Sequence, residues 1–376
     1  MIFWGVLGGM VYLAGLNDFI RSGNRIVYKW LPVVVALALF LVSAMRYHIG
    51  WDYDAYASLF YSVDENMTYP EKSLIWLSIF LREVGFSSQA LIAIYAAITF
   101  FFFYKGFQFY FRDRVTPWVL FFFLPFAYWA SMNQIRQMAA VSVIFFSSRY
   151  LVQRKFYLYA IWTLIAAFFH TSAVVCILLY PFITKKMPLK GHIVVVLGAA
   201  LLGILGYGEE GISLLLQAFD SRAAAYLAEI RVTPSLGYLL FYGISWLFTI
   251  IMSKNINEIK MKIQWGGDSF CRVIAMIENM STLSIVIMFV FYFSYTLMTR
   301  FLEYFSVFYL LAFSIYIFTR VNVFHKICAY HILVFMFAMY FFINLSHIEN
   351  NPGAIANSSI SANKIEYEMT VDFFDP

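Results

Sequence analysis

The chain has little charge and few cysteines for its 376 residues. Asp, Glu, Lys and Arg make up 12% of the residues, which is about half the share of a typical soluble domain. The three cysteines have no zinc-binding or CxxC spacing. Walker A, G-x-S-x-G and HExxH motifs are absent from the sequence. These absences exclude P-loop nucleotide hydrolysis, serine hydrolase chemistry of the elbow type and zincin-type proteolysis.

Hydrophobic residues, by contrast, make up 62% of the chain, and aromatic residues make up 21%. The apolar stretches are long and unbroken rather than alternating, which is typical of membrane-spanning helices. The sequence therefore predicts an all-α polytopic membrane protein whose first partner is the lipid bilayer. The net charge of +5 lies in short loops between the apolar stretches, so it predicts no nucleic-acid partner.

Apolar runs predict ten ordinary membrane spans and one overlong segment. The ordinary spans are 2–17, 27–45, 88–104, 115–130, 135–151, 192–207, 236–252, 273–298, 300–318 and 327–345. The overlong run at 156–183 is too long for one straight crossing and too short for two full ones, at about 28 residues. We interpret it as a short helical hairpin that bends near His170, which brings the total to about 10–12 transmembrane helices.

The charges of the loops predict the orientation of these spans. Loops 21–25, 105–114, 152–155, 184–190, 253–262 and 319–326 are mostly basic and are predicted to be cytoplasmic. Loops 46–72 and 208–234 are acidic and are predicted to be external. The alternation holds only if 156–183 crosses an even number of times, which supports the hairpin. We expect a single transmembrane domain over 1–345 and a periplasmic polar tail over 346–376.

Several polar residues fall on the outer side of this topology, where the positive-inside rule does not explain arginine. They are Arg46, Asn133, Arg136, Gln137, His170 and Arg300. Arginine binds phosphate with two parallel hydrogen bonds and does not lose its charge. We therefore expect an anionic ligand at this face, of the kind that a lipid-linked pyrophosphate provides. The alternative is that arginines at span ends extend to lipid headgroups, and that His170 donates to a neighbouring helix carbonyl.

The stretch after Arg46 carries acids among aromatic residues. Asp52 and Asp54 form an Asp-x-Asp pair, which in some membrane glycosyltransferases holds a divalent metal. The alternatives are that both acids are solvated, that one pairs with Arg46, or that one acts as a base toward a sugar hydroxyl. Tyr53 and Tyr56 suit either a sugar surface or the membrane interface. We expect no bound metal and no cofactor.

Four motifs in order give the chain a family resemblance. They are Arg46-x-x-x-Gly50-x-Asp52-Tyr53-x-x-Tyr56, Asn133-x-x-Arg136-Gln137-x-x-Ala140, Phe169-His170-x-Ser172-Ala173 and Arg300-x-x-x-Tyr304-Phe305. This series resembles the EpsG/Wzy family of bacterial polysaccharide repeat-unit polymerases, which includes O-antigen polymerases. The resemblance runs from about the second span to the last.

The resemblance implies a fold like that of the helical GT-C glycosyltransferases. It implies transfer of a growing glycan from undecaprenyl pyrophosphate to the non-reducing end of a lipid-linked repeat unit, at the periplasmic face of the inner membrane. Arg46, Arg136 and Arg300 would bind pyrophosphate. His170 would orient or deprotonate the acceptor hydroxyl, with Asp52 as the rival base. The expected substrate-binding residues are Arg46, Tyr53, Asp54, Tyr56, Asn133, Gln137 and Tyr304.

Two other functions fit parts of the sequence. An O-antigen ligase would use a similar donor and fold, but it would transfer the finished glycan to the lipid A core. A transporter or flippase of lipid-linked oligosaccharides would need polar residues along a path through the bilayer. The outward polar residues favour the polymerase, whose partners would be the lipid-linked donor and acceptor. A chain-length regulator is a further candidate partner.

Overall fold

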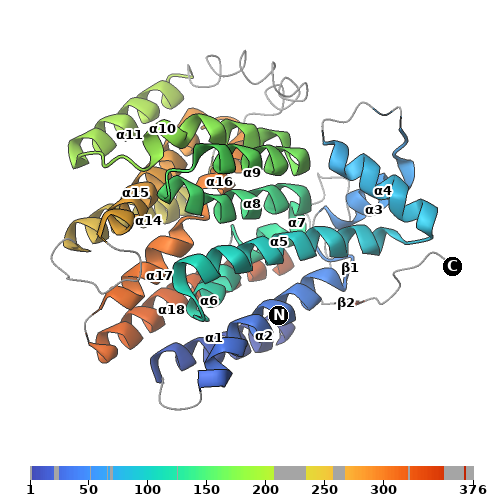
Figure 1. Ribbon diagram of the computed structural model, residues 1–376, viewed down its shortest axis with the longest axis horizontal. Coiled ribbons are helices and arrows are strands. Elements are labelled where there is room, and N and C mark those ends of the chain that lie inside the picture. Colours follow the sequence, from blue (N-terminus) through green and yellow to red (C-terminus); the bar gives the residue numbers. More distant parts are fainter. Residues whose placement is uncertain are drawn as a thin grey trace. The chain divides into compact units, whose positions relative to one another are not determined.

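A computed structural model (Figure 1) describes residues 2–20, 25–50, 52–65, 67, 71–124, 126–206, 234–256, 267–320, 322–350 and 368–369. The predicted external loop at 208–234 therefore lies almost wholly outside the described residues. The described part of the chain forms these helices and strands: α1 (Ile2–Ile20), α2 (Arg25–Ala44), β1 (Arg46–Tyr47), α3 (Tyr53–Ser62), α4 (Lys72–Val84), α5 (Ser88–Phe111), α6 (Thr116–Phe123), α7 (Tyr128–Asn133), α8 (Ile135–Val152), α9 (Phe156–Phe169), the 3-10 helix η1 (Thr171–Leu179), α10 (Tyr180–Ile183), α11 (Leu189–Ile204), α14 (Leu236–Ile256), α15 (Gly267–Val290), α16 (Tyr295–Ser306), α17 (Tyr309–Thr319), α18 (Val323–Asn350) and β2 (Glu368–Met369).

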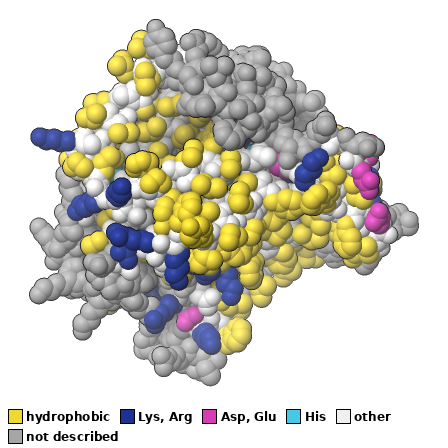
Figure 2. Space-filling model, turned by 45° about the horizontal axis from the view of Figure 1, so that its top comes forward, with side chains coloured by type: hydrophobic (Ala, Val, Ile, Leu, Met, Phe, Trp, Pro, Cys, Tyr) yellow, Lys and Arg dark blue, Asp and Glu magenta, His cyan; other side chains and the backbone are white. Residues whose placement is uncertain are grey.

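The predicted all-α polytopic membrane fold is confirmed. Among the described residues, six helical stretches are long and apolar enough to cross a bilayer: Ile2–Ile20, Ser88–Phe111, Leu236–Ser253, Ser269–Val290, Leu297–Thr319 and Val323–Ile343. Four shorter apolar helices accompany them: Lys29–Ala44, Phe156–Phe169, Thr171–Ile183 and Leu189–Ile204. Figure 2 shows hydrophobic side chains (yellow) over much of the face in view, as expected of a surface that meets lipid.

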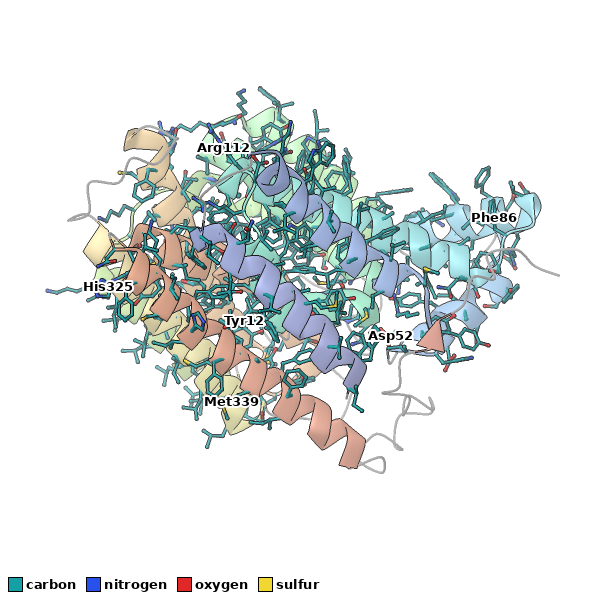
Figure 3. All side chains as sticks on the ribbon, turned by 90° about the horizontal axis from the view of Figure 1, so that it is seen from below. Tyr12, Asp52, Phe86, Arg112, His325 and Met339 are labelled. Atoms are coloured by element: carbon teal, nitrogen blue, oxygen red, sulfur yellow. The ribbon has the colours of Figure 1, made fainter. Side chains whose placement is uncertain are left out.

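The chain divides into two compact units, and the first consists of 1–146 and 320–376. In this unit α1 packs against α6 and α18, and α2 packs against α5. A Cβ on Gly15 would lie only 2.3 Å from the Tyr330 hydroxyl, so α1 and α18 approach closely where glycine allows it. The Tyr330 hydroxyl donates to the carbonyl of Tyr12 (2.7 Å), which Figure 3 labels in α1.

Asp18 fixes the start of α6 within the same unit. Its buried carboxylate accepts hydrogen bonds from the backbone amides of Val115 and Thr116, and from the Thr116 hydroxyl (2.7 Å). These amides belong to the first turn of a helix, where no intrahelical acceptor exists, so a carboxylate satisfies them well. The side chain of Asp18 thereby ties the end of α1 to the beginning of α6.

Three predicted spans, 115–130, 273–298 and 300–318, are interrupted in the structure. The prediction of one helix over 115–130 is wrong, because α6 ends at Phe123 and α7 begins at Tyr128. The sequence places Pro125 between them, and proline lacks the amide that a continuous helix needs. The turn expected next to Arg300 lies earlier, after the end of α15 at Val290, so Arg300 falls within the second turn of α16.

The predicted hairpin over 156–183 is present in the second unit, which consists of 147–319. α9 ends at Phe169, His170 is extended, and η1 begins at Thr171 and packs back against α9. The Tyr159 hydroxyl of α9 donates to the Cys176 carbonyl of η1 (2.8 Å). The second arm is mainly a 3-10 helix rather than the α-helix expected. In the same unit α15 packs against α11, α14 and α16.

A small strand pair was not predicted. β1 follows α2 directly and pairs antiparallel with β2 from the C-terminal tail, with Arg46 opposite Met369 and Tyr47 opposite Glu368. The side of the membrane for the tail, and the single transmembrane domain, stay predictions.

Candidate active site

The guanidinium of Arg46 organises the chain where α2 ends. Its side chain is fully buried, at 0% exposure, and it donates to the carbonyls of Ser43 (2.5 Å), Ile49 (3.0 Å) and Met132 (2.7 Å). Ser43 belongs to the last turn of α2, whose carbonyls lack intrahelical partners. Arg46 therefore caps α2, closes the following loop on itself and binds that loop to the end of α7.

Gly50 brings the same loop against α7. Its φ is +100°, a conformation that favours glycine. A Cβ at this position would lie 2.9 Å from both the Asn133 side-chain oxygen and the Met132 carbonyl. Asn133 is nearly buried and donates to the Trp129 carbonyl (3.1 Å), and Gln137 is buried one turn further along in α8. The first two sequence motifs thus meet in space.

Arg136 lies in the first turn of α8 and forms an ion pair with Glu71 (2.9 Å). Glu71 immediately precedes α4. The guanidinium also lies 5.4 Å from the centre of the Tyr56 ring, with its Nε 3.5 Å from the Tyr56 hydroxyl. The Glu71 carboxylate and the Tyr56 side chain thus hold the Arg136 guanidinium at the N-terminal end of α8, and the N-terminal end of a helix favours anions.

Polar bonds also fix the residues around Asp52, which Figure 3 labels just before α3. The Tyr53 hydroxyl donates to the Gln89 side-chain oxygen (2.7 Å), and the Gln89 amide donates to the carbonyls of Ala44 and Arg46. Burial raises the pKa of Tyr53, so its hydroxyl remains protonated. The Tyr53 side chain therefore acts as a neutral support for the loop.

Asp54 pairs with His48. These two side chains are more exposed than the others, at 32% for Asp54 and 40% for His48. His48 has a φ of +52°, so the loop turns sharply to present it. In the parts of the chain that the structure describes, no three His, Cys, Asp or Glu side chains gather where they could hold a metal ion. The pairing gives Asp54 a basic partner within its own loop.

In the second unit, a hydrogen bond joins the hairpin to α16, the helix that carries Arg300 and Tyr304. His170 is buried at the bend, and the Ser172 hydroxyl donates to the Tyr304 hydroxyl (3.2 Å). Arg300 is half-buried one turn before Tyr304 on α16, and the buried Glu303 also follows Arg300 by nearly one turn. The third and fourth motifs therefore meet through a direct hydrogen bond.

The predicted residues thus form two groups. Eight lie in the first unit: Arg46, Asp52, Tyr53, Asp54, Tyr56, Asn133, Arg136 and Gln137. Three lie in the second unit: His170, Arg300 and Tyr304. Sequence reasoning missed Glu71, which it treated only as one of several loop acids. Only the acidic character of the loop 46–72 marked it as a source of an anionic partner for an arginine, and nothing in the sequence singled out Glu71 among its acids.

The fold defines the class of the protein, that of all-α polytopic membrane proteins. The sequence profile of the EpsG family matches residues 29–361 of the chain. The chain therefore belongs to the EpsG family, a family of polysaccharide-polymerase-like membrane proteins. Comparisons with curated proteins and with solved structures give no match.

Proposed function

We propose that this protein polymerises lipid-linked oligosaccharide repeat units. It transfers a growing glycan from undecaprenyl pyrophosphate to the non-reducing end of an incoming lipid-linked repeat unit, at the periplasmic face of the bacterial inner membrane. The observation that carries this proposal is the Arg136 fork, held at the start of α8 by a carboxylate and a tyrosine. EpsG-family membership supports the same reaction class.

The geometry suggests different tasks for the predicted arginines. Arg136 and Arg300 are partly exposed, and each can offer a fork of N–H donors to phosphate oxygens. Arg46 is fully buried against backbone carbonyls, so its proposed task is to position the loop that carries Asp52. Asn133, Gln137, Tyr53, Asp54, Tyr56 and Tyr304 are the proposed sugar-contacting and supporting residues.

The proposed glycan transfer needs no cofactor. The acceptor hydroxyl oxygen forms a new bond to C1 of the donor sugar, and the bond from C1 to the pyrophosphate oxygen breaks. The electron pair leaves on the pyrophosphate, where the arginines stabilise the growing charge. The hydroxyl proton passes to His170, with Asp52 as the rival base.

The test uses purified protein in nanodiscs with a synthetic lipid-linked repeat unit. Wild-type protein is expected to give a ladder of chain lengths and to release undecaprenyl pyrophosphate. Arg300→Gln should lower the rate by about 100-fold or more, because phosphate charge stabilisation is a large part of the catalytic effect. Arg112→Gln is the matched control, since it removes the same charge from an exposed arginine at the C-terminal end of α5 (Figure 3), which is outside the proposed site.

Three results would contradict the proposal. One is a wild-type protein that forms no ladder from competent substrate. Another is an Arg300→Gln variant that polymerises at the wild-type rate. A third is transfer of a finished glycan to a lipid core acceptor without chain extension, which would favour the ligase.

A further inference from the structure

The ion pair between Arg136 and Glu71 is unequal. The Glu71 side chain is 1% exposed, whereas that of Arg136 is 14% exposed. The Glu71 carboxylate is therefore almost completely shielded from solvent, whereas part of the Arg136 side chain is accessible. Neither the four motifs nor the predicted roles include Glu71.

Glu71 is held firmly in this position. Its carbonyl accepts the amide of Leu74 at the start of α4 (3.2 Å). One residue beyond Lys72, the Ser73 hydroxyl bonds the buried Tyr95 hydroxyl of α5 (3.1 Å). The backbone around the carboxylate is thus anchored to two helices. A carboxylate anchored in this way cannot swing far from Arg136 when a second anion arrives.

A fixed negative charge beside an arginine has two effects on a phosphate ligand. It orients the guanidinium, and it subtracts from the attraction that the guanidinium exerts. One unit charge about 6–12 Å from a phosphate charge changes phosphate binding by about ten- to a hundredfold at an effective dielectric of about 20. The leaving pyrophosphate gains negative charge during transfer, so the product is the species that an unbalanced arginine would hold most tightly.

We propose that Glu71 is a positioning residue that sets the affinity of Arg136 for isoprenyl pyrophosphate, so that the carrier lipid is released after each transfer. This inference rests on the proposed function of the same site. Glu71 touches Arg136 rather than the reacting atoms. Its charge, rather than its shape, is the property that matters, because it opposes the retention of the product.

The test measures binding and turnover separately in wild-type protein, Glu71→Gln, Glu71→Asp and Glu83→Gln. Glu83→Gln is the matched control, because Glu83 is exposed on α4, the helix that Glu71 immediately precedes. The binding probe is farnesyl pyrophosphate, with farnesyl monophosphate for comparison, measured by microscale thermophoresis in detergent. Turnover is measured in the ladder assay described above.

Glu71→Gln is expected to bind farnesyl pyrophosphate at least about tenfold more tightly, with a smaller gain for the monophosphate. Its KM and kcat should both fall, because product release becomes slower. A merely structural role would raise KM or reduce the yield of folded protein instead. Glu71→Asp, which keeps the charge, should remain close to wild type in pyrophosphate affinity, as should Glu83→Gln.

Two results overturn the inference. Folded Glu71→Gln that binds pyrophosphate no more tightly than wild type refutes the role of Glu71 while leaving the proposed function standing. Wild-type protein that neither binds farnesyl pyrophosphate nor polymerises refutes the proposed function, and the role of Glu71 with it.

Discussion

Replacing Arg46 by Lys separates the charge of this residue from its geometry. The guanidinium donates to three carbonyls, of Ser43, Ile49 and Met132, that lie in different directions. A lysine ammonium is a single point and cannot reach all three. If two carbonyls lose their partner, and each buried unpaired group costs about 1–3 kcal/mol, the unit should lose about 2–6 kcal/mol of stability.

That loss should lower the unfolding temperature by about 10 °C in a unit of this size. The measurement is tryptophan fluorescence during heating in detergent, followed by the ladder assay at a temperature where both proteins are folded. Arg82→Lys is the matched control. Arg82 also donates to two carbonyls, of Tyr61 (2.7 Å) and Val63 (2.5 Å), but it is partly exposed, so water can replace its bonds. Its melting temperature should change by only about 3 °C or less.

One result would refute this reasoning. If Arg46→Lys melts and polymerises like wild type, a positive charge alone suffices at this position. Arg46 would then act on the substrate through its charge rather than by shaping the loop.

Two further variants test features of the first unit. Asp18→Asn should cost about 2–3 kcal/mol, because its carboxylate accepts several charge-assisted hydrogen bonds at the start of α6, and thermal unfolding in detergent would report the loss; an unchanged melting temperature would contradict this. Gly50→Ala should reduce polymerisation by about tenfold or more in the ladder assay, since an alanine resists a φ of +100° and its Cβ would press on Asn133. Gly85→Ala is the control for backbone conformation alone, because Gly85 has a φ of +86° with open space around it.

The helical hairpin could be predicted from the sequence because its signals are one-dimensional. A run of a given length has to fit a bilayer of fixed thickness, and basic loops have to return to one side. The break between α6 and α7 could also have been predicted from the local sequence, since Pro125 lies between the two helices. The prediction failed there because the apolar run on both sides of the proline looked continuous.

The site was harder to predict because its contacts join distant positions. The structure brings Gly50 against Asn133 and joins Ser172 to Tyr304 by a hydrogen bond, and the four motifs did not specify either contact. No local pattern shows that Glu71 reaches Arg136 across 65 residues, or that Arg46 bonds backbone carbonyls. Every residue has a backbone carbonyl, so the sequence does not show which carbonyls accept a hydrogen bond. An arginine that bonds backbone carbonyls therefore cannot be distinguished in the sequence from an arginine that binds a ligand.

The first unit is built from two separate stretches of the chain, so it can be completed only late in synthesis. The unit joins 1–146 to 320–376, and 147–319 is synthesised between them. The face of α1 around Gly15 meets α18 through Tyr330, which leaves the ribosome more than 300 residues later. Until then this face must be covered by lipid or by an insertion chaperone. A chain truncated just before α18 should therefore contain the whole second unit and an open first unit.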